Sequence, residues 1–160
     1  MRYTILILIL LFTGCSLKRE IKKSESYMVV IKMKNLRFND TGFLKYGDNY
    51  TELQLFDIST PVLDMKISDD ICINSHCFGK KEFNARFLSP LYPETLLENV
   101  LNKKPIFKKA DFKKSKDGYA QNIDKKNIRI KYIISSNKIY FKDFSNHFLI
   151  KLKRIKSEVF

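Results

Sequence analysis

Residues 93–105 of this chain are PETLLENVLNKKP, and this stretch decides the fold. Proline is tolerated in the first turn of a helix, and the glutamate after it suits the positive end of the helix dipole. The two lysines suit the negative end, and the second proline stops the helix. The apolar residues lie at helical spacing on one stripe: Leu96, Leu97, Val100 and Leu101. The stretch therefore predicts a helix that must cover another element.

On the amino-terminal side of this helix the sequence predicts a shorter helix and, before that, strands. Residues 80–88 place Phe83 and Phe87 four apart, and Ser89-Pro90 ends that helix. Residues 39–42 and 47–49 are typical of turns. Alternation of apolar and polar residues predicts strands over 26–38, 42–46, 50–57, 62–67 and 71–78.

On the carboxyl-terminal side, strands are predicted over 127–135, 138–144 and 147–155. In the first of these Ile128, Ile130, Tyr132 and Ile134 share one face, and lysines occupy much of the opposite side. The order of strands, helices and strands favours the α+β class over a parallel α/β sheet. We expect a curved antiparallel β-sheet, unclosed and barrel-like, packed against one or two helices.

The amino terminus predicts export. Met1-Arg2 supplies a positive end, and the run from Tyr3 to Phe12 is apolar apart from Thr4. This run is about half of the roughly 20 residues that a transmembrane helix needs, so it predicts a cleaved leader.

The end of the leader, Leu11-Phe12-Thr13-Gly14-Cys15, resembles the lipobox of bacterial lipoproteins, although Phe12 stands where leucine is usual. The resemblance implies cleavage before Cys15 and a lipid, palmitate included, on its thiol. The alternative is an ordinary cleaved signal that leaves a plain thiol. The predicted organisation is a signal peptide over 1–14, a lipidated tether over 15–25 and one periplasmic domain over 26–160. Ser16 stands where aspartate holds lipoproteins in the inner membrane, which favours the periplasmic face of the outer membrane.

The remaining cysteines, Cys72 and Cys77, form an even pair in an oxidising compartment, and four residues separate them. This spacing suits cross-strand partners beside a tight turn, so we expect a structural disulfide. A redox pair, or a metal site with His76, is the alternative, but no second pair of ligands lies nearby in the sequence.

The charge is strongly basic, with 30 Lys+Arg against 17 Asp+Glu and a formal net charge of +13. Cleavage would remove only Arg2 from this count and leave about +12. Behind an export signal the available polyanions are phospholipid headgroups, lipopolysaccharide and peptidoglycan, so no nucleic-acid partner is expected. The alternative is that the charge, which is spread along the chain, is a solvated surface.

The run Val100-Leu101-Asn102-Lys103-Lys104-Pro105 at a helix end, followed by Gly118-Tyr119 and a closing antiparallel run, resembles the LolB-type outer-membrane lipoprotein receptors. That family usually has a tryptophan near this helix end and glycine where Lys103 stands; this chain has no tryptophan. The resemblance implies an unclosed β-barrel lidded by helices, whose apolar cavity accepts the acyl chains of lipoproteins.

Catalysis is not expected. The only histidines, His76 and His147, lie in no nucleophile-elbow, zinc-helix or phosphate-loop pattern, so we predict no catalytic residue, metal or cofactor. The sequence predicts a lipid-anchored binding protein, with the membrane as a partner through Cys15. It accepts acyl chains of lipoproteins in LolB-like fashion, or it docks on an envelope assembly through its basic face or an edge strand.

Overall fold

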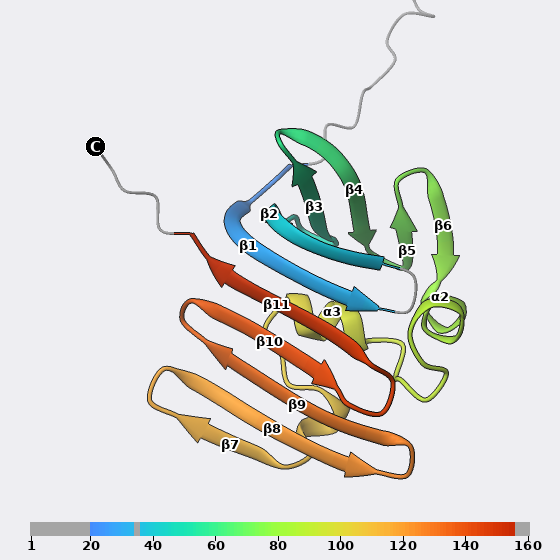
Figure 1. Cartoon of the computed structure of the whole chain (residues 1–160), viewed down its shortest axis with the longest axis vertical. Helices are drawn as coiled ribbons and strands as arrows, with labels where there is room; N and C mark the ends of the chain where they lie inside the picture. Colours follow the sequence, from blue (N-terminus) through green and yellow to red (C-terminus); the bar gives the residue numbers. More distant parts are fainter. Residues whose placement is uncertain (1–19, 34–35, 156–160) are drawn as a thin grey trace, which may run out of the picture.

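Alternation of apolar and polar residues puts most of this chain into strands, and the strands form one open sheet (Figure 1). A computed structural model describes residues 20–33 and 36–155. The strands are β1 (Lys23–Met33), β2 (Leu36–Tyr46), β3 (Thr51–Asp57), β4 (Thr60–Ile67), β5 (Asp70–Ile73), β6 (His76–Gly79), β7 (Phe112–Ser115), β8 (Gly118–Lys125), β9 (Ile128–Ser135), β10 (Lys138–Asp143) and β11 (Phe148–Arg154). Their order across the sheet is β6-β5-β4-β3-β2-β1-β11-β10-β9-β8-β7.

Two runs of neighbouring antiparallel strands build this sheet, one before the helices and one after them. β1 to β6 follow one another across one half, and β11 to β7 across the other. β1 and β11 join the halves, with Tyr27 opposite Arg154 and Lys32 opposite Leu149. The outermost strands, β6 and β7, do not pair with each other. The predicted fold class is therefore confirmed: a curved, unclosed antiparallel sheet with helices packed against it.

In the sequence, the helices lie between the two runs of strands. They are α2 (Lys80–Phe87), α3 (Leu96–Leu101) and a 3-10 turn at Phe107–Lys109. α2 agrees with the prediction, whereas α3 is shorter than expected because residues 93–95 form a turn that precedes it, closed by a hydrogen bond from Leu96 N to Pro93 O of 2.9 Å. In the described part of the chain, no helix has the length and apolar character needed to span a bilayer.

The core lies between the sheet and α3. All four apolar residues of the α3 stripe are buried, and they face inward-pointing side chains from both halves of the sheet, such as Leu44 of β2 and Phe141 of β10. In Figure 1 α3 lies beside β1 and β11, at the centre of the sheet. We call the side of the sheet that carries α3 the inner face and the opposite side the outer face.

Three predictions at the amino-terminal end are wrong. The predicted strand over 26–38 is two strands, because β1 ends at Met33 and β2 begins at Leu36; the predicted turn over 39–42 lies inside β2. The predicted tether over 15–25 also ends too late. β1 begins at Lys23, and Glu25 is buried in the sheet, so residues 23–25 belong to the domain.

β8 was not predicted. On its inner face Tyr119, Gln121 and Ile123 alternate with outward-pointing residues, so only one aliphatic side chain marks the strand. Gln121 is fully buried, because its amide bonds to the segment after α3: Oε1 accepts from Ile106 N at 2.8 Å and Nε2 donates to Ile106 O at 3.0 Å. A buried polar residue thus stands at a position where the alternation pattern of a strand requires an apolar one, and the sequence does not reveal β8.

Candidate functional site

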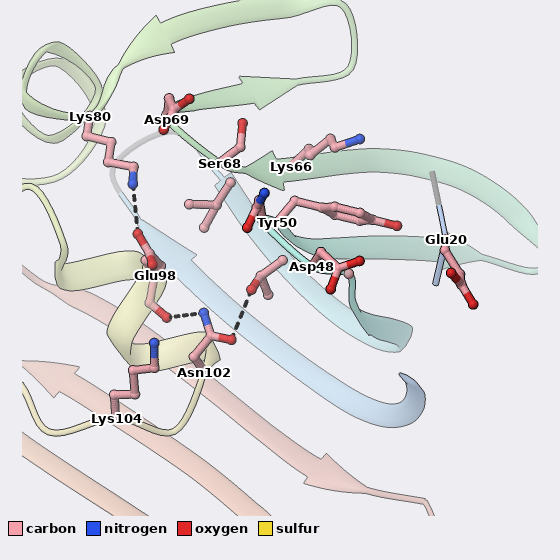
Figure 2. Close-up of a pocket in the computed structure, with 14 residues that line it drawn as sticks. Glu20, Asp48, Tyr50, Lys66, Ser68, Asp69, Lys80, Glu98, Asn102 and Lys104 are labelled. Atoms are coloured by element: carbon pink, nitrogen blue, oxygen red, sulfur yellow. Dashed lines mark hydrogen bonds and ion pairs between the residues drawn. The ribbon is translucent and has the colours of Figure 1, made fainter. Parts of the chain in front are cut away.

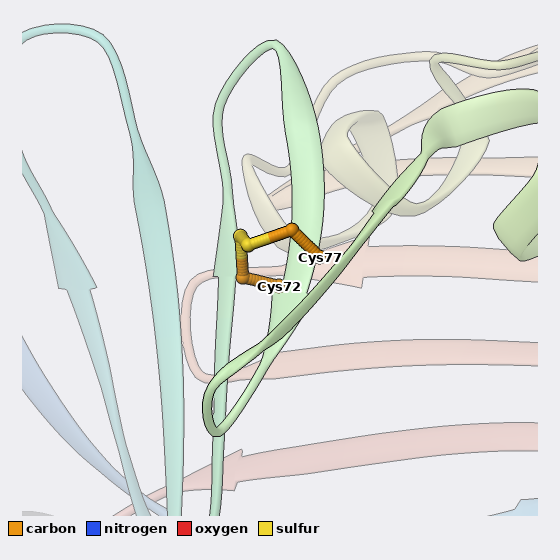
Figure 3. The surroundings of a disulfide bond; sticks show 2 residues. All are labelled: Cys72 and Cys77. Carbon is orange, nitrogen blue, oxygen red and sulfur yellow. A yellow bond between two sulfur atoms is a disulfide. The ribbon is translucent and has the colours of Figure 1, made fainter.

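The two predicted site cysteines in the described part of the chain are joined. Cys72 in β5 and Cys77 in β6 lie directly opposite each other and form a disulfide (Figure 3). The neighbouring Ile71 is buried in the core, so alternation places the two cysteines on the outer face. The prediction of a structural disulfide is confirmed. Cys15, the predicted lipidation site, lies outside the described residues.

The centre of the inner face is filled by the side chains of α3, and Leu101 is fully buried there. The two described pockets are lined mostly by polar and charged side chains. Aromatic rings continue this packing: Tyr132 and Phe141 have centroids 6.3 Å apart, and Phe141 and Phe148 5.4 Å apart. An acyl chain would therefore have to displace α3 from the sheet.

Three tyrosines from three strands hold the carboxyl-terminal end of α3. Tyr46 of β2 donates to Leu101 O at 3.3 Å, Tyr119 of β8 to Lys103 O at 3.0 Å, and Tyr132 of β9 to Lys104 O at 3.0 Å. Leu101 O belongs to the last turn of α3, whose carbonyls a helix leaves without partners, whereas Lys103 O and Lys104 O belong to the segment after α3. Burial and the neighbouring Tyr119 hydroxyl raise the pKa of Tyr132 far above its usual range, so its hydroxyl remains a donor.

A buried carboxylate ties the segment after α3 to the start of β1. Glu25 Oε2 accepts from the Tyr27 hydroxyl at 2.7 Å and from Lys103 Nζ at 3.1 Å, while Oε1 lies 3.1 Å from Lys23 Nζ and 3.3 Å from Arg154 Nη2. Burial acts to raise the pKa of Glu25, but the hydrogen bonds from Tyr27, Lys23 and Lys103 outweigh it and lower the pKa to about 2. Glu25 is therefore a charged structural anchor.

A polar, open pocket lies beside α3. Its volume is about 880 Å³, and it lies among the turns after β2 and β4, α3 and the start of α2 (Figure 2). The Lys80–Glu98 ion pair of 2.7 Å borders it, as does a hydrogen bond of 3.0 Å from Thr51 Oγ1 to Asn102 Oδ1. Its volume would suit a small molecule, but its walls carry charges of both signs where such sites are mostly apolar. It is not the dry cavity that acyl chains need.

The outer face has two regions with different charge patterns. Over β2 to β4 the charges are paired: Lys45 Nζ lies 3.4 Å from Glu52 Oε1 and 2.6 Å from Gln54 Oε1, and Gln54 Nε2 donates to Asp64 Oδ2 at 3.2 Å. Lys66 lies over the ring of Tyr50, 4.3 Å from its centroid. The lysines of this half of the outer face therefore have partners, whereas Arg37 of β2 lies opposite Lys32.

Over β1, β11, β10 and β9 the outer face carries lysines that pair with no carboxylate, although Lys142 Nζ lies 4.5 Å from the centroid of the Phe144 ring. Register and alternation place twelve outward positions side by side on these four strands, between Met28 and Lys32, Leu149 and Lys153, Lys138 and Lys142, and Lys131 and Ser135. No position in this block is acidic. Six are lysines, which we call the lysine face: Lys32, Lys131, Lys138, Lys142, Lys151 and Lys153. Within the described residues, none forms an ion pair with a carboxylate.

The two histidines lie apart from these features. His76 is an exposed residue of the edge strand β6, and His147 is exposed in the turn before β11 with φ of 53°. Residues 20–33 and 36–155 contain no group of three or more histidine, cysteine or acidic residues arranged to hold a metal ion.

The fold and the surface together define the class of protein to which this chain belongs. Its sheet is open and antiparallel, a short helix fills the inner face, and the lysine face makes part of the outer face basic. No family model, curated protein or solved structure matches this chain.

Sequence reasoning missed most of these features. In the sequence, the lysine face is visible only as lysines on one side of the closing strands, with Lys138 and Lys142 on either side of Tyr140, and Lys151 and Lys153 after Leu149. The pairing of β1 with β11 brings Lys32 beside them. Glu25 was assigned to the tether because charged residues surround it. Its one distinguishing signal is Tyr27 two residues later, which lies on the same side of a strand.

Proposed function

We propose that this protein is a lipid-anchored protein of the bacterial outer membrane, held at Cys15 on the periplasmic side, whose domain binds and does not catalyse. The leader and the lipobox-like Leu11 to Cys15 support the anchor. The disulfide supports an oxidising compartment, because such bonds form and persist outside the cytoplasm.

The packing of α3 supports docking through the protein surface over uptake of an acyl chain into the sheet. Its apolar stripe fills the inner face, and three tyrosine hydroxyls from β2, β8 and β9 bond to the carbonyls of its last residue and of the segment that follows it. A bound acyl chain would have to replace both the packing and these hydrogen bonds. This is the single observation on which the choice of docking rests.

The outer face is the better docking surface, because both edges of the sheet are guarded. β7 is four residues long and carries Lys113 and Lys114, and β6 is equally short and is tied to β5 by the disulfide. Short strands and lysines are the devices by which proteins prevent pairing at a sheet edge. The lysine face has no comparable protection.

Two measurements test this proposal. Labelled palmitate should be incorporated into the wild-type protein and not into Cys15→Ser; equal incorporation would remove the anchor. The purified protein should also take up no fluorescent fatty acid. If uptake failed while palmitate labelling succeeded, docking by a lipid-anchored protein would stand.

The second candidate function is the LolB-like acceptor of acyl chains. The specific observation in its favour is the unclosed sheet, whose edges β6 and β7 remain apart, with only a six-residue helix over its centre. In this case α3 would leave the sheet when a lipoprotein arrives from its carrier. Saturable uptake of a fatty acid or of a lipoprotein would replace the docking proposal with this one.

A further inference from the structure

The lysine face contains pairs of lysines in opposite positions on neighbouring strands, an arrangement that does not favour folding. Lys138 lies directly opposite Lys153, and Lys131 directly opposite Lys142. Like charges in such cross-strand positions are destabilising. The β2 to β4 half of the same outer face pairs its lysines with acidic and polar residues, so the fold itself does not impose this repulsion.

The face is broad rather than pocketed. Its lysines lie on four adjacent strands, and neither described pocket has one of them in its wall. Half-buried apolar side chains, among them Val30, Ile133 and Tyr140, lie between the lysines. Lysine stems can lie along such residues while the ammonium groups stay in water. Lysine presents a hydrated point charge, whereas the planar guanidinium of arginine binds one phosphate or carboxylate through two hydrogen bonds. A surface of lysines therefore suits a wide anionic plane better than a single small ligand.

The position of the tether adds the second argument. The chain enters the domain through β1, one of the four strands of the lysine face, and Cys15 precedes Lys23 by eight residues. Even a fully extended connection of that length spans at most about 30 Å. A lipid on Cys15 would therefore keep the lysine face close to the bilayer surface.

We propose that the lysine face lies on the surface of the membrane that holds the lipid anchor and binds the phosphate groups of anionic phospholipids. This inference rests on the proposed anchor at Cys15. Each lysine near an anionic bilayer strengthens binding about fivefold, so several together fix the orientation of a domain that is already tethered. The inner face, with α3 and the polar pocket, then points away from the membrane.

The test measures which lysines the membrane covers. The full lipidated protein is placed in vesicles of phosphatidylcholine alone, or with about 30 mol % phosphatidylglycerol. A water-soluble amine-acylating reagent is added, and mass spectrometry gives the labelling rate of each lysine. The lysine face should be labelled at least threefold more slowly in the anionic vesicles, whereas the exposed Lys81 of α2 and Lys108 after α3 should be labelled equally in both. About 0.5 M salt should abolish the difference.

A charge-matched pair of variants identifies the surface. Lys138→Gln with Lys151→Gln and Lys153→Gln should remove the protection of Lys131 and Lys142. Lys81→Gln with Lys108→Gln and Lys109→Gln lowers the net charge equally and should retain it.

The outcomes separate this inference from the proposal on which it depends. Failure of the protein to float with either kind of vesicle would overturn the anchor itself. Flotation with equal labelling of the lysine face in both vesicles would overturn the membrane contact alone. If the same lysines were then protected in intact cells, another anionic component of the envelope, and not the phospholipid surface, would occupy the face.

Discussion

At the scale of single residues, Glu25 is a buried carboxylate with four partners. Three cations and one hydroxyl converge on a carboxylate that is 4% exposed, and they connect β1, β11 and the segment after α3. Replacement by glutamine would leave Lys103 beside a neutral amide. Because the three cations are partly exposed and can regain water, we expect Glu25→Gln to lower the free energy of unfolding by about 1–3 kcal/mol at pH 7.

The pH dependence of this loss identifies charge as its cause. The pKa of Glu25 is about 2 in the folded protein, against its usual 4.5. Because its pKa is lower in the folded protein, the ionised Glu25 carboxylate stabilises the fold. This contribution is complete above about pH 4.5 and disappears as the pH falls through 2. The difference between wild type and Glu25→Gln in urea unfolding should therefore shrink from pH 6 to pH 2.5. A gap of the same size at both pH values would show that only packing was lost.

At the scale of elements, Gly42 explains why one predicted turn is a strand. A side chain there would meet the Gln54 carbonyl of β3 at 2.7 Å and a methyl of Val29 at 3.0 Å. We expect Gly42→Ala to destabilise the protein by about 1–3 kcal/mol, because β2 and β3 would have to separate. Gly79→Ala is the control, since a Cβ there meets nothing within 4 Å. Equal stability of the two variants in urea would disprove the close approach.

The same example shows how much of the fold the sequence could predict. Asn39 to Gly42 has the composition of a turn, yet its glycine is needed for a close approach of strands that only the tertiary structure creates. The hairpin at residues 47–49, α2, the last three strands and the disulfide followed from local patterns, which the structure confirms. The pairing of β1 with β11, and with it the lysine face, is a contact between the two ends of the chain. No local pattern encodes its register.

The end of α3 gives the second prediction at this scale. Tyr132 is fully buried and donates to Lys104 O at 3.0 Å, so Tyr132→Phe should cost about 1 kcal/mol in urea unfolding. Amide exchange at Asn102, whose N–H bonds to Glu98 O, should become faster. Tyr140→Phe on the outer face should change stability by less than about 0.5 kcal/mol. If both substitutions had the same effect, the hydroxyl would not be holding the helix end.

At the scale of the whole molecule, two structures connect the halves of the sheet. One is the β1·β11 pairing. The other is α3 with the segment that follows it, which together bond to Tyr46 in one half and to Tyr119 and Tyr132 in the other. Each half alone would consist of strands that pair with their neighbours in the sequence. Without the other half, part of its inner face would be uncovered. The shared core should therefore make unfolding a single transition.

Leu101→Ala tests this coupling, because Leu101 is fully buried at the centre of that shared core. We expect a loss of about 2–5 kcal/mol with an unchanged denaturant slope. Hydrogen exchange near the midpoint should show β1 to β6 and β7 to β11 losing protection together. Leu91→Ala, at a side chain that is 48% exposed, should have little effect. If one half lost protection at lower urea than the other, the halves would be independent units, and removal of α3 would open the inner face without unfolding the sheet. That result would favour the acyl-chain acceptor over the docking protein.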